Sequence, residues 1–176
     1  MSAVIALAGL AGSGKSTAAN YLIEKHGFVR VKFAGPLKDM LRAFGLTDAH
    51  IEGPLKELPT PLLCGQTPRH AMQTLGTEWR DLIHRDLWIN MWSQTVTDVL
   101  DRGGRVVTDD CRFSHEASVV AGFGGVVARV ACPWAGLATG GGHASENGGL
   151  AHDVVIWNDE KDNLDRLYRQ LDELVG

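Results

Sequence analysis

Five short apolar runs recur along the chain, each bounded by glycine or polar residues. They cover residues 3–8, 28–33, 105–108, 125–131 and 153–157. Their length and their content of Val, Ile and Ala predict buried β-strands. Between them lie longer stretches in which apolar residues recur at the three- and four-residue spacing of a helix.

Two of these helical stretches are well defined. Residues 16–26 place Ala18, Tyr21 and Leu22 on one face. Near the C-terminus, the apolar positions at helical spacing are Leu164, Leu167, Tyr168, Leu171, Leu174 and Val175. Strands that alternate with helices indicate a parallel sheet with right-handed crossovers. The pattern therefore predicts an α/β fold in which helices flank a five-stranded parallel sheet.

Two stretches interrupt this alternation. Residues 36–92 form a long insertion of helical character that contains five prolines. Residues 133–151 are rich in glycine, and a loop of that length inside a compact domain is typical of a lid or an unstructured piece. We therefore expect one domain over 1–176, with its core in 1–35, 93–132 and 152–176.

Length, composition and charge narrow the class of protein. The chain has 176 residues, of which 44% are hydrophobic and 22% charged, as in a soluble globular domain. The net charge of −4 argues against a stable nucleic-acid partner. No basic, apolar leader and no apolar run of 18 residues is present, so we expect neither secretion nor a membrane partner. Three widely spaced cysteines fit reduced thiols in a cytoplasmic protein.

The segment from Gly9 to Ser16 reads GLAGSGKS and lies between the first predicted strand and the first predicted helix. This is the context in which G-x-x-x-x-G-K-[ST] forms a phosphate-binding P-loop. Glycines let successive N–H groups point at an anion, and the helix N-terminus adds partial positive charge. We expect ATP phosphates to lie on Ala11, Gly12, Ser13, Gly14, Lys15, Ser16 and Thr17. Lys15 would contact the β- and γ-phosphates, and the Ser16 hydroxyl would bind Mg²⁺.

A second candidate lies at the end of the run 105–108, where Asp109 and Asp110 follow. A carboxylate at the end of a strand beside the P-loop strand is a suitable partner for Mg²⁺. Adjacent strand residues point to opposite faces, so the two aspartates cannot easily share this role, and the residues alone leave the choice open. Arg112 follows as a candidate for binding phosphate oxygens.

The insertion contains a third candidate. A helix is predicted from Pro68 to Arg85, with Thr67 as its N-cap. At about 100° per residue, the apolar side chains of Met72, Leu75, Trp79, Leu82 and Ile83 share one face. Arg69, Gln73 and Arg80 form a separate stripe with Gly76 between them. Such a stripe suits a planar anionic ligand, although an ordinary solvated face has the same pattern, and a break at Gly76–Thr77 would dissolve it.

Several motifs together resemble the phage deoxynucleoside monophosphate kinase family. They are the P-loop, FAGPLK at 33–38, TPR at 67–69, Q-x-LGTEWR at 73–80, D-x-RF-x-x-E at 110–116, H-x-SE at 143–146, and Asp153 with Asn158. The similarity spans nearly the whole chain in the expected order. The GTEWR and D-x-RF-x-x-E blocks are much narrower signals than the P-loop, which a very large superfamily shares.

The resemblance implies a P-loop kinase fold in which a helical insertion binds the acceptor and a Gly-rich lid closes. It implies transfer of phosphate from ATP, with Mg²⁺, to a deoxynucleoside monophosphate for viral DNA precursor synthesis. The implied acceptor-binding residues are Lys38, Arg69, Gln73, Thr77, Glu78 and Arg80. The implied catalytic residues are Lys15, Asp110 and Arg112, the implied metal ligands Ser16 and Asp110, and the implied lid residues His143 and Glu146.

The chain departs from the usual nucleotide-kinase pattern in its lid, because residues 133–151 contain no arginine. Transition-state charge would then be met by Lys15, Mg²⁺ and arginines elsewhere, such as Arg112 and Arg129. The expected partners are small nucleotides, and a homodimer is compatible with the sequence.

Two alternative functions remain open at this point. One is a P-loop kinase with another acceptor, such as dephospho-coenzyme A or a modified base in phage DNA. Phe33 and Ala34 stand where dephospho-coenzyme A kinases usually have an acidic residue, and the acidic net charge disfavours DNA. The other is a nucleotide-binding module that transfers nothing. The chain has no N-K-x-D guanine signature, and its insertion is larger than a switch loop needs.

Overall fold

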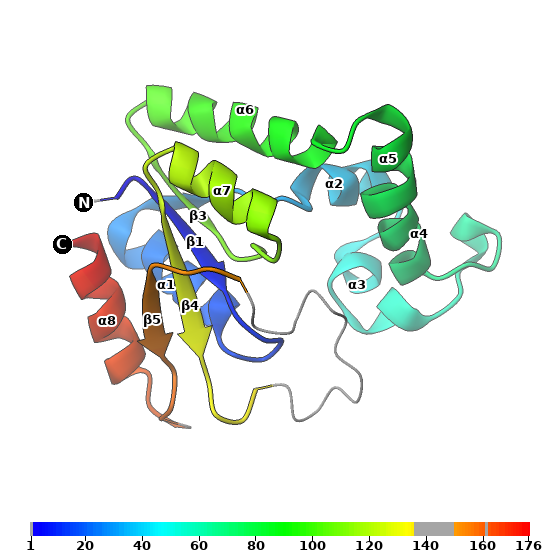
Figure 1. Cartoon of the computed structure of the whole chain (residues 1–176). Helices are drawn as coiled ribbons and strands as arrows, with labels where there is room; N and C mark the ends of the chain where they lie inside the picture. The colour runs from blue at the N-terminus through cyan, green and yellow to red at the C-terminus, as the bar shows by residue number, and fades with distance from the viewer. Residues whose placement is uncertain (1, 136–149, 161) are drawn as a thin grey trace. The chain divides into compact units, whose positions relative to one another are not determined.

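The computed structural model describes residues 2–135, 150–160 and 162–176. The chain divides into two compact units, which we describe separately. Residues 1–32 and 93–176 form the core unit, and Phe33–Trp92 form the insert unit. Figure 1 colours the chain from its N-terminus to its C-terminus.

The core unit contains one five-stranded sheet in which all pairings are parallel. Its strands are β1 (Val4–Ala8), β2 (Phe28–Arg30), β3 (Arg105–Thr108), β4 (Val126–Ala131) and β5 (Val154–Trp157). Their spatial order is β2-β3-β1-β4-β5, which confirms the predicted fold class. The strand predicted over 28–33 ends earlier, at Arg30, although the N–H of Val31 still donates to the carbonyl of Val107 at 3.0 Å.

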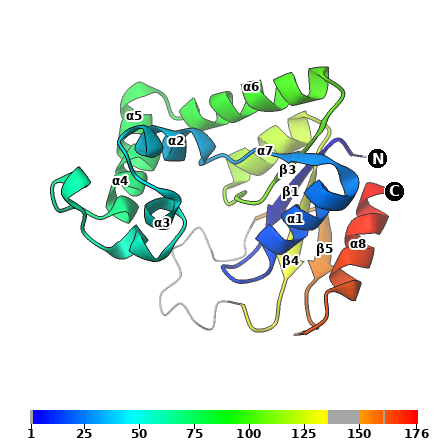
Figure 2. The same ribbon diagram turned by 180° about the vertical axis from the view of Figure 1, so that it is seen from behind.

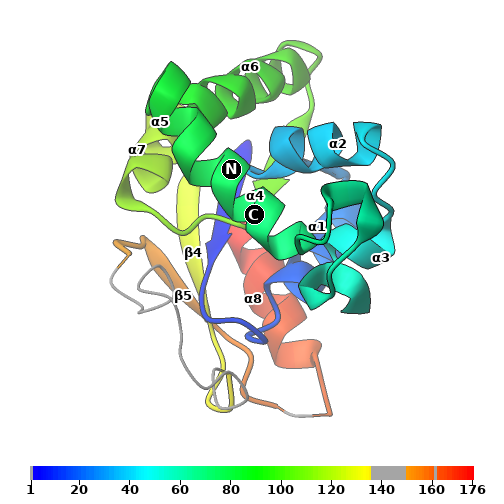
Figure 3. The same cartoon turned by 90° about the vertical axis from the view of Figure 1, so that its right-hand side faces the viewer.

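Helices cover both faces of this sheet, as Figure 3 shows. Helices α1 (Lys15–His26) and α8 (Asp165–Val175) pack together on one face, and α7 (Ser114–Gly122) packs on β1 and β4 from the other. Ile5 and Leu7 join the apolar core under α1 and α8, together with Ile156 and Leu171. All five residues of β1 are buried, so the strand before the P-loop is the most enclosed part of the sheet.

The insert unit is built from short helices, seen from behind in Figure 2. They are α2 (Gly35–Ala43), α3 (Asp48–Ile51), η1 (Pro54–Glu57), η2 (Pro61–Leu63), α4 (Pro68–Thr74), the π-helical η3 (Leu75–Trp79) and α5 (Arg80–Ile83). Leu41, Leu46 and Ile51 form its small apolar core, against which Met72 and Leu75 pack. The ring of Phe33 stacks on that of Trp92 with their centroids 4.5 Å apart, so aromatic packing joins the two ends of this unit.

Helix α6 (Leu87–Asp101) contains the boundary between the units, which falls between Trp92 and Ser93. It is the longest helix in the described parts of the chain. No helix in those parts has both the length and the apolar composition that crossing a bilayer requires.

The helix predicted from Pro68 to Arg85 differs from expectation in the middle. It begins as predicted, because the Thr67 hydroxyl accepts a hydrogen bond from the N–H of His70 at 3.1 Å. At Leu75–Trp79 the helix becomes a π-helix, whose i→i+5 bonding places one more residue in the turn. Residues beyond that turn are rotated by about 100° from an unbroken α-helix.

This rotation makes the predicted apolar face wrong beyond the π-helix. Met72 and Leu75 pack on the insert core, but the Leu82 side chain is 84% exposed and that of Ile83 is 53% exposed. For the same reason Arg80 does not continue the line that Arg69 and Gln73 begin.

A group of polar side chains joins α1 to α8. Oδ1 of Asp172 accepts a hydrogen bond from the Tyr21 hydroxyl at 3.0 Å and lies 2.8 Å from Nε2 of His26, and Oδ2 accepts one from Nζ of Lys25 at 2.8 Å. The Tyr21 ring also stacks on Tyr168 with their centroids 3.9 Å apart. The hydrogen bond from Lys25, followed by that from His26, lowers the pKa of the Asp172 carboxyl to about 2.

We expect Asp172→Asn to lower the melting temperature by a few degrees at pH 7. A carboxyl whose pKa is lower in the folded state stabilises the fold above its unfolded pKa of 3.8, and the effect disappears as the pH falls towards 2. The gap between wild type and variant should therefore narrow from pH 5 to pH 2 in thermal melts. The neighbouring exposed Glu173, changed to Gln, is the control and should melt like wild type. A gap independent of pH would contradict this account.

Candidate functional site

The loop between β1 and α1 depends on its glycines. Gly9, Gly12 and Gly14 have φ of 138°, 78° and 100°. Residues other than glycine rarely adopt backbone angles in this region. The three glycines therefore let the chain turn directly from a buried strand into a helix, in the shape that a phosphate-binding loop requires.

Val130 of β4 and Asn158, which follows β5, lie very close to this loop. A Cβ atom on Gly9 would meet the carbonyl oxygen of Val130 at 2.5 Å, and one on Gly14 would meet Nδ2 of Asn158 at the same distance. Asn158, which follows β5, donates from that Nδ2 to the carbonyl of Ser13 at 2.9 Å. Asn158 belongs to the motifs of the family resemblance, but no local pattern in the sequence indicates its contact with the loop.

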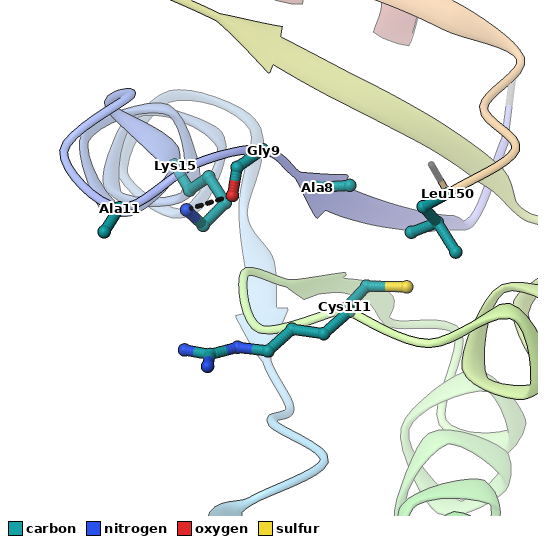
Figure 4. A pocket seen from close by; sticks show the side chains of 7 residues that line it. Ala8, Gly9, Ala11, Lys15, Cys111 and Leu150 are labelled. Carbon is teal, nitrogen blue, oxygen red and sulfur yellow. Dashed lines mark hydrogen bonds between the residues drawn. The ribbon is translucent and has the colours of Figure 1, made fainter. Parts of the chain in front are cut away.

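Lys15 is the first residue of α1, and its side chain folds back over the loop (Figure 4). Its Nζ donates to the carbonyls of Gly9 and Leu10, both at 2.8 Å. No acidic residue occupies the first turn of α1, so the ammonium and the helix N-terminus together favour an anion. The Ser16 side chain beside it is exposed, and that of Thr17 is half-buried.

β3 lies beside β1, so Asp109 and Asp110 follow a strand that neighbours the loop strand. The two carboxylates have different surroundings. Asp109 is buried, with Arg30 Nε 3.6 Å and Lys32 Nζ 3.5 Å from its oxygens. Asp110 is half-buried and accepts a hydrogen bond from the Thr108 hydroxyl at 3.0 Å.

The segment after Asp110 is held by Glu116 in the first turn of α7. One oxygen of this buried carboxylate accepts from the N–H groups of Arg112 at 2.7 Å and Phe113 at 3.0 Å. Burial raises the Glu116 pKa to about 7, and these hydrogen bonds oppose the rise only in part. A glutamate three residues after a helix N-cap is a known capping signal, which could have revealed this contact from the sequence.

A small pocket connects this segment with the loop. Its lining consists of Ala8, Gly9, Ala11, Lys15, Cys111, Arg112 and Leu150 (Figure 4). Its volume of about 50 Å³ admits a few water-sized groups, such as phosphate oxygens. The structure thus brings together Lys15 and the exposed Arg112 from the predicted set. It also adds Cys111, a buried thiol whose pKa is raised by that burial.

The predicted acceptor-binding residues all belong to the insert unit. Each of the three cations lies against a carboxylate of that unit: Lys38 Nζ is 2.6 Å from Glu52, Arg69 pairs with Glu57, and Arg80 is 2.7 Å from Asp81. The side chains of the remaining three, Gln73, Thr77 and Glu78, are exposed. The charges of these three cations are therefore locally neutralised, and among the three the Arg69 side chain is the most exposed, at 48%.

Three other predicted features have a simpler outcome. Arg129 lies in β4 and is half-buried. The lid residues His143 and Glu146 lie outside the described residues. In the described segments, no group of three or more His, Cys, Asp or Glu side chains could hold a metal ion.

Comparison with known proteins relates these features to a family. No protein-family model matches the chain. A protein of Acanthamoeba polyphaga mimivirus, named "Putative deoxynucleotide monophosphate kinase", is 32% identical over 184 residues, which cover 96% of this chain and 93% of that protein.

A crystal structure of a "putative kinase" from Chloroflexus aurantiacus is similar with a TM-score of 0.43 and 14% identity. The match covers 73% of this chain and 58% of that one, so this chain spans less than two thirds of its length. That likeness does not contribute to the assignment. The mimivirus relative does, because its similarity extends over nearly the whole of both chains, and we conclude that this chain belongs to the deoxynucleotide monophosphate kinase family.

Proposed function

We propose that this chain transfers the γ-phosphoryl group of ATP to a deoxynucleoside monophosphate and releases the diphosphate. One observation carries the proposal: a chain of this family has Lys15 poised over a glycine loop at the end of its central strand. Family membership also favours a transferase over a nucleotide-binding module. Because the substrates would be free nucleotides, we place the reaction in the cytoplasm.

On the donor side, the ATP phosphates would lie on residues 11–17. The loop N–H groups and the start of α1 favour the negative charge, and Lys15 would exchange its bonds to Gly9 and Leu10 for phosphate oxygens. A charge-assisted bond to phosphate is stronger than one to a neutral carbonyl, which makes this exchange favourable.

The site also fits Mg²⁺, because it offers hard oxygen donors. The exposed Ser16 hydroxyl and the half-buried Asp110 carboxylate would hold the ion together with phosphate oxygens. Asp110 suits this role better than Asp109, whose two neighbouring cations already neutralise it and would repel a third. When bound, the ion supplies positive charge that offsets the charge of the phosphates.

On the acceptor side, we propose that the insert unit binds the nucleoside monophosphate through Lys38, Arg69, Gln73, Thr77, Glu78 and Arg80. The pairing of its cations with carboxylates supports this, since a phosphate can replace a carboxylate as the partner of an arginine or lysine. A Cβ atom placed on Gly76 would lie 3.8 Å from the Leu37 side chain, so η3 packs closely on α2 at this glycine. We further propose that residues 133–151 act as a lid within a single kinase domain.

The chemistry needs little help from a base, because a phosphate oxygen of the acceptor is already ionised when it attacks. Catalysis then consists of positioning and charge neutralisation. Arg112 is placed for the second task, because it lines the same pocket as Lys15 and its backbone is held by Glu116. Exclusion of water by the lid would suppress hydrolysis of ATP.

The reaction itself is tested by incubating the protein with Mg-ATP and each of the four deoxynucleoside monophosphates. We expect ADP and a deoxynucleoside diphosphate to form in equal amounts with at least one of them. ADP release that does not depend on any acceptor would contradict the proposal and favour an ATPase. Ribonucleoside monophosphates in the same assay would show whether the sugar is discriminated.

We expect Lys15→Ala to lower turnover by about 10²–10³-fold, because one positive charge at the transferred phosphate is lost. The variant should still fold, since the Lys15 side chain is only half-buried and does not belong to the apolar core. Steady-state rates and thermal melts measure both effects. Near-normal turnover in a folded variant would refute the role of Lys15.

We expect Arg69→Ala and Arg80→Ala to raise KM for the acceptor about tenfold or more and to leave KM for ATP unchanged. Arg85→Ala is the matched control in the same unit, because its side chain is 85% exposed and its contact with Asp86 is 3.6 Å long. Unchanged acceptor kinetics in both test variants would remove them from the acceptor site.

A further inference from the structure

A second positively charged site lies at the edge of the core unit, outside the P-loop. It consists of Arg30 at the end of β2, Lys32 two residues later, and the Asp109 carboxylate between them. The Asp109 side chain is 2% exposed, while those of Arg30 and Lys32 are 29% and 26% exposed. One buried anion thus lies beneath two cations that reach solvent.

Arg30 and Asp109 contain polar atoms that are not fully hydrogen-bonded. Both ion-pair distances exceed the 2.7–2.9 Å typical of a charge-assisted hydrogen bond. Within the described residues, Nε of Arg30 and both carboxylate oxygens of Asp109 are buried and have no hydrogen-bond partner. Arg30 makes one other contact, from its guanidinium to the side chain of Asn20 at 2.5 Å. Of these three atoms, only the Arg30 Nε–H is a donor that an anionic ligand could satisfy, because the carboxylate oxygens of Asp109 are acceptors.

The net charge of the cluster favours an anionic ligand. Two cations and one carboxylate leave a net charge of +1 at neutral pH. Two cations held close together repel each other, and the negative charge of Asp109 between them offsets this repulsion. A buried carboxylate that spaces two partly exposed cations is suited to hold them for a multiply charged group such as a phosphate.

The position of the cluster relates it to the P-loop. In the sheet, Arg30 of β2 pairs with Val107 of β3, which pairs with Ile5 of β1. Arg30, the last residue of β2, and Asp109, which comes directly after β3, therefore both lie at the carboxyl-terminal ends of the parallel strands. Arg30 contacts Asn20 of α1, and Asn20 lies one turn after Ser16. The cluster is therefore on the α1 face, the face on which the P-loop helix begins. Two strand spacings separate β2 from β1, about 10 Å.

We propose that Arg30 and Lys32, spaced by Asp109, bind the phosphate group of the acceptor nucleotide. The P-loop already provides for the donor phosphates at the end of β1, and the in-line reaction requires a second phosphate a short distance away on the same edge of the sheet. This assignment rests on the proposed kinase function.

The test compares Arg30→Gln and Lys32→Gln with Arg102→Gln. Glutamine removes the charge and keeps most of the side-chain length. Arg102 serves as the matched control. It is an exposed arginine of the core unit in the turn before β3, so it lies near the amino-terminal end of that strand, away from Arg30 and Lys32. We expect the two test variants to raise KM for the deoxynucleoside monophosphate about tenfold or more, with KM for ATP within about twofold of wild type. Arg102→Gln should match wild type in both.

Calorimetric titration with a deoxynucleoside monophosphate in the absence of ATP gives a second readout. Weaker binding in both test variants supports the proposal even if wild type shows no transfer, an outcome that would refute the kinase function alone. Unchanged acceptor KM and binding in an active enzyme would overturn the proposal alone. A rise confined to KM for ATP would assign the cations to the donor phosphates and would also overturn it. If Arg30→Gln does not fold, Arg30→Lys and Lys32→Gln decide the question.

Discussion

The close approach of the Gly9–Gly14 backbone to its neighbours is the constraint on which the rest of the core unit depends. β1 occupies the centre of the sheet, so the turn that follows it is flanked by the end of β4 and by Asn158 after β5. Only backbone without side chains fits there. The close packing of this turn brings backbone N–H groups, the N-terminus of α1 and the Lys15 side chain together at the loop.

Around this point the core unit arranges its charges in two ways. Lys15 and Arg112 line an open pocket and contribute positive charge close to the loop. Asp109, by contrast, is buried and neutralised by Arg30 and Lys32, whereas Asp110 stays half-exposed and bonded to Thr108. Two carboxylates that are neighbours in the chain thus have different surroundings and different partners.

The insert unit differs from the core unit, since its apolar core is small and several of its large apolar side chains, such as Phe44, Leu62 and Leu82, are exposed. Three of its cations, Lys38, Arg69 and Arg80, are each paired with a carboxylate, which holds their side chains in place without a ligand. Exposed ion pairs of this kind contribute little to stability, so they can be exchanged at low cost. A unit built in this way is suited to bind an anion reversibly.

The sequence by itself determined the α/β fold, four of the five strands to within one residue of each end, the start of the insertion helix at Thr67, and the P-loop with its lysine. These features depend on local patterns of apolar residues, glycines and caps, which neighbouring residues specify. Tertiary structure decided what local patterns cannot contain. The π-helix at Leu75–Trp79 rotated Arg80 away from Arg69, because a constant 100° step assumes an unbroken α-helix. The contacts of Asn158 with Ser13, and of Asp109 with Arg30, join residues far apart in the chain, and only the packing of strands side by side brings such pairs within reach.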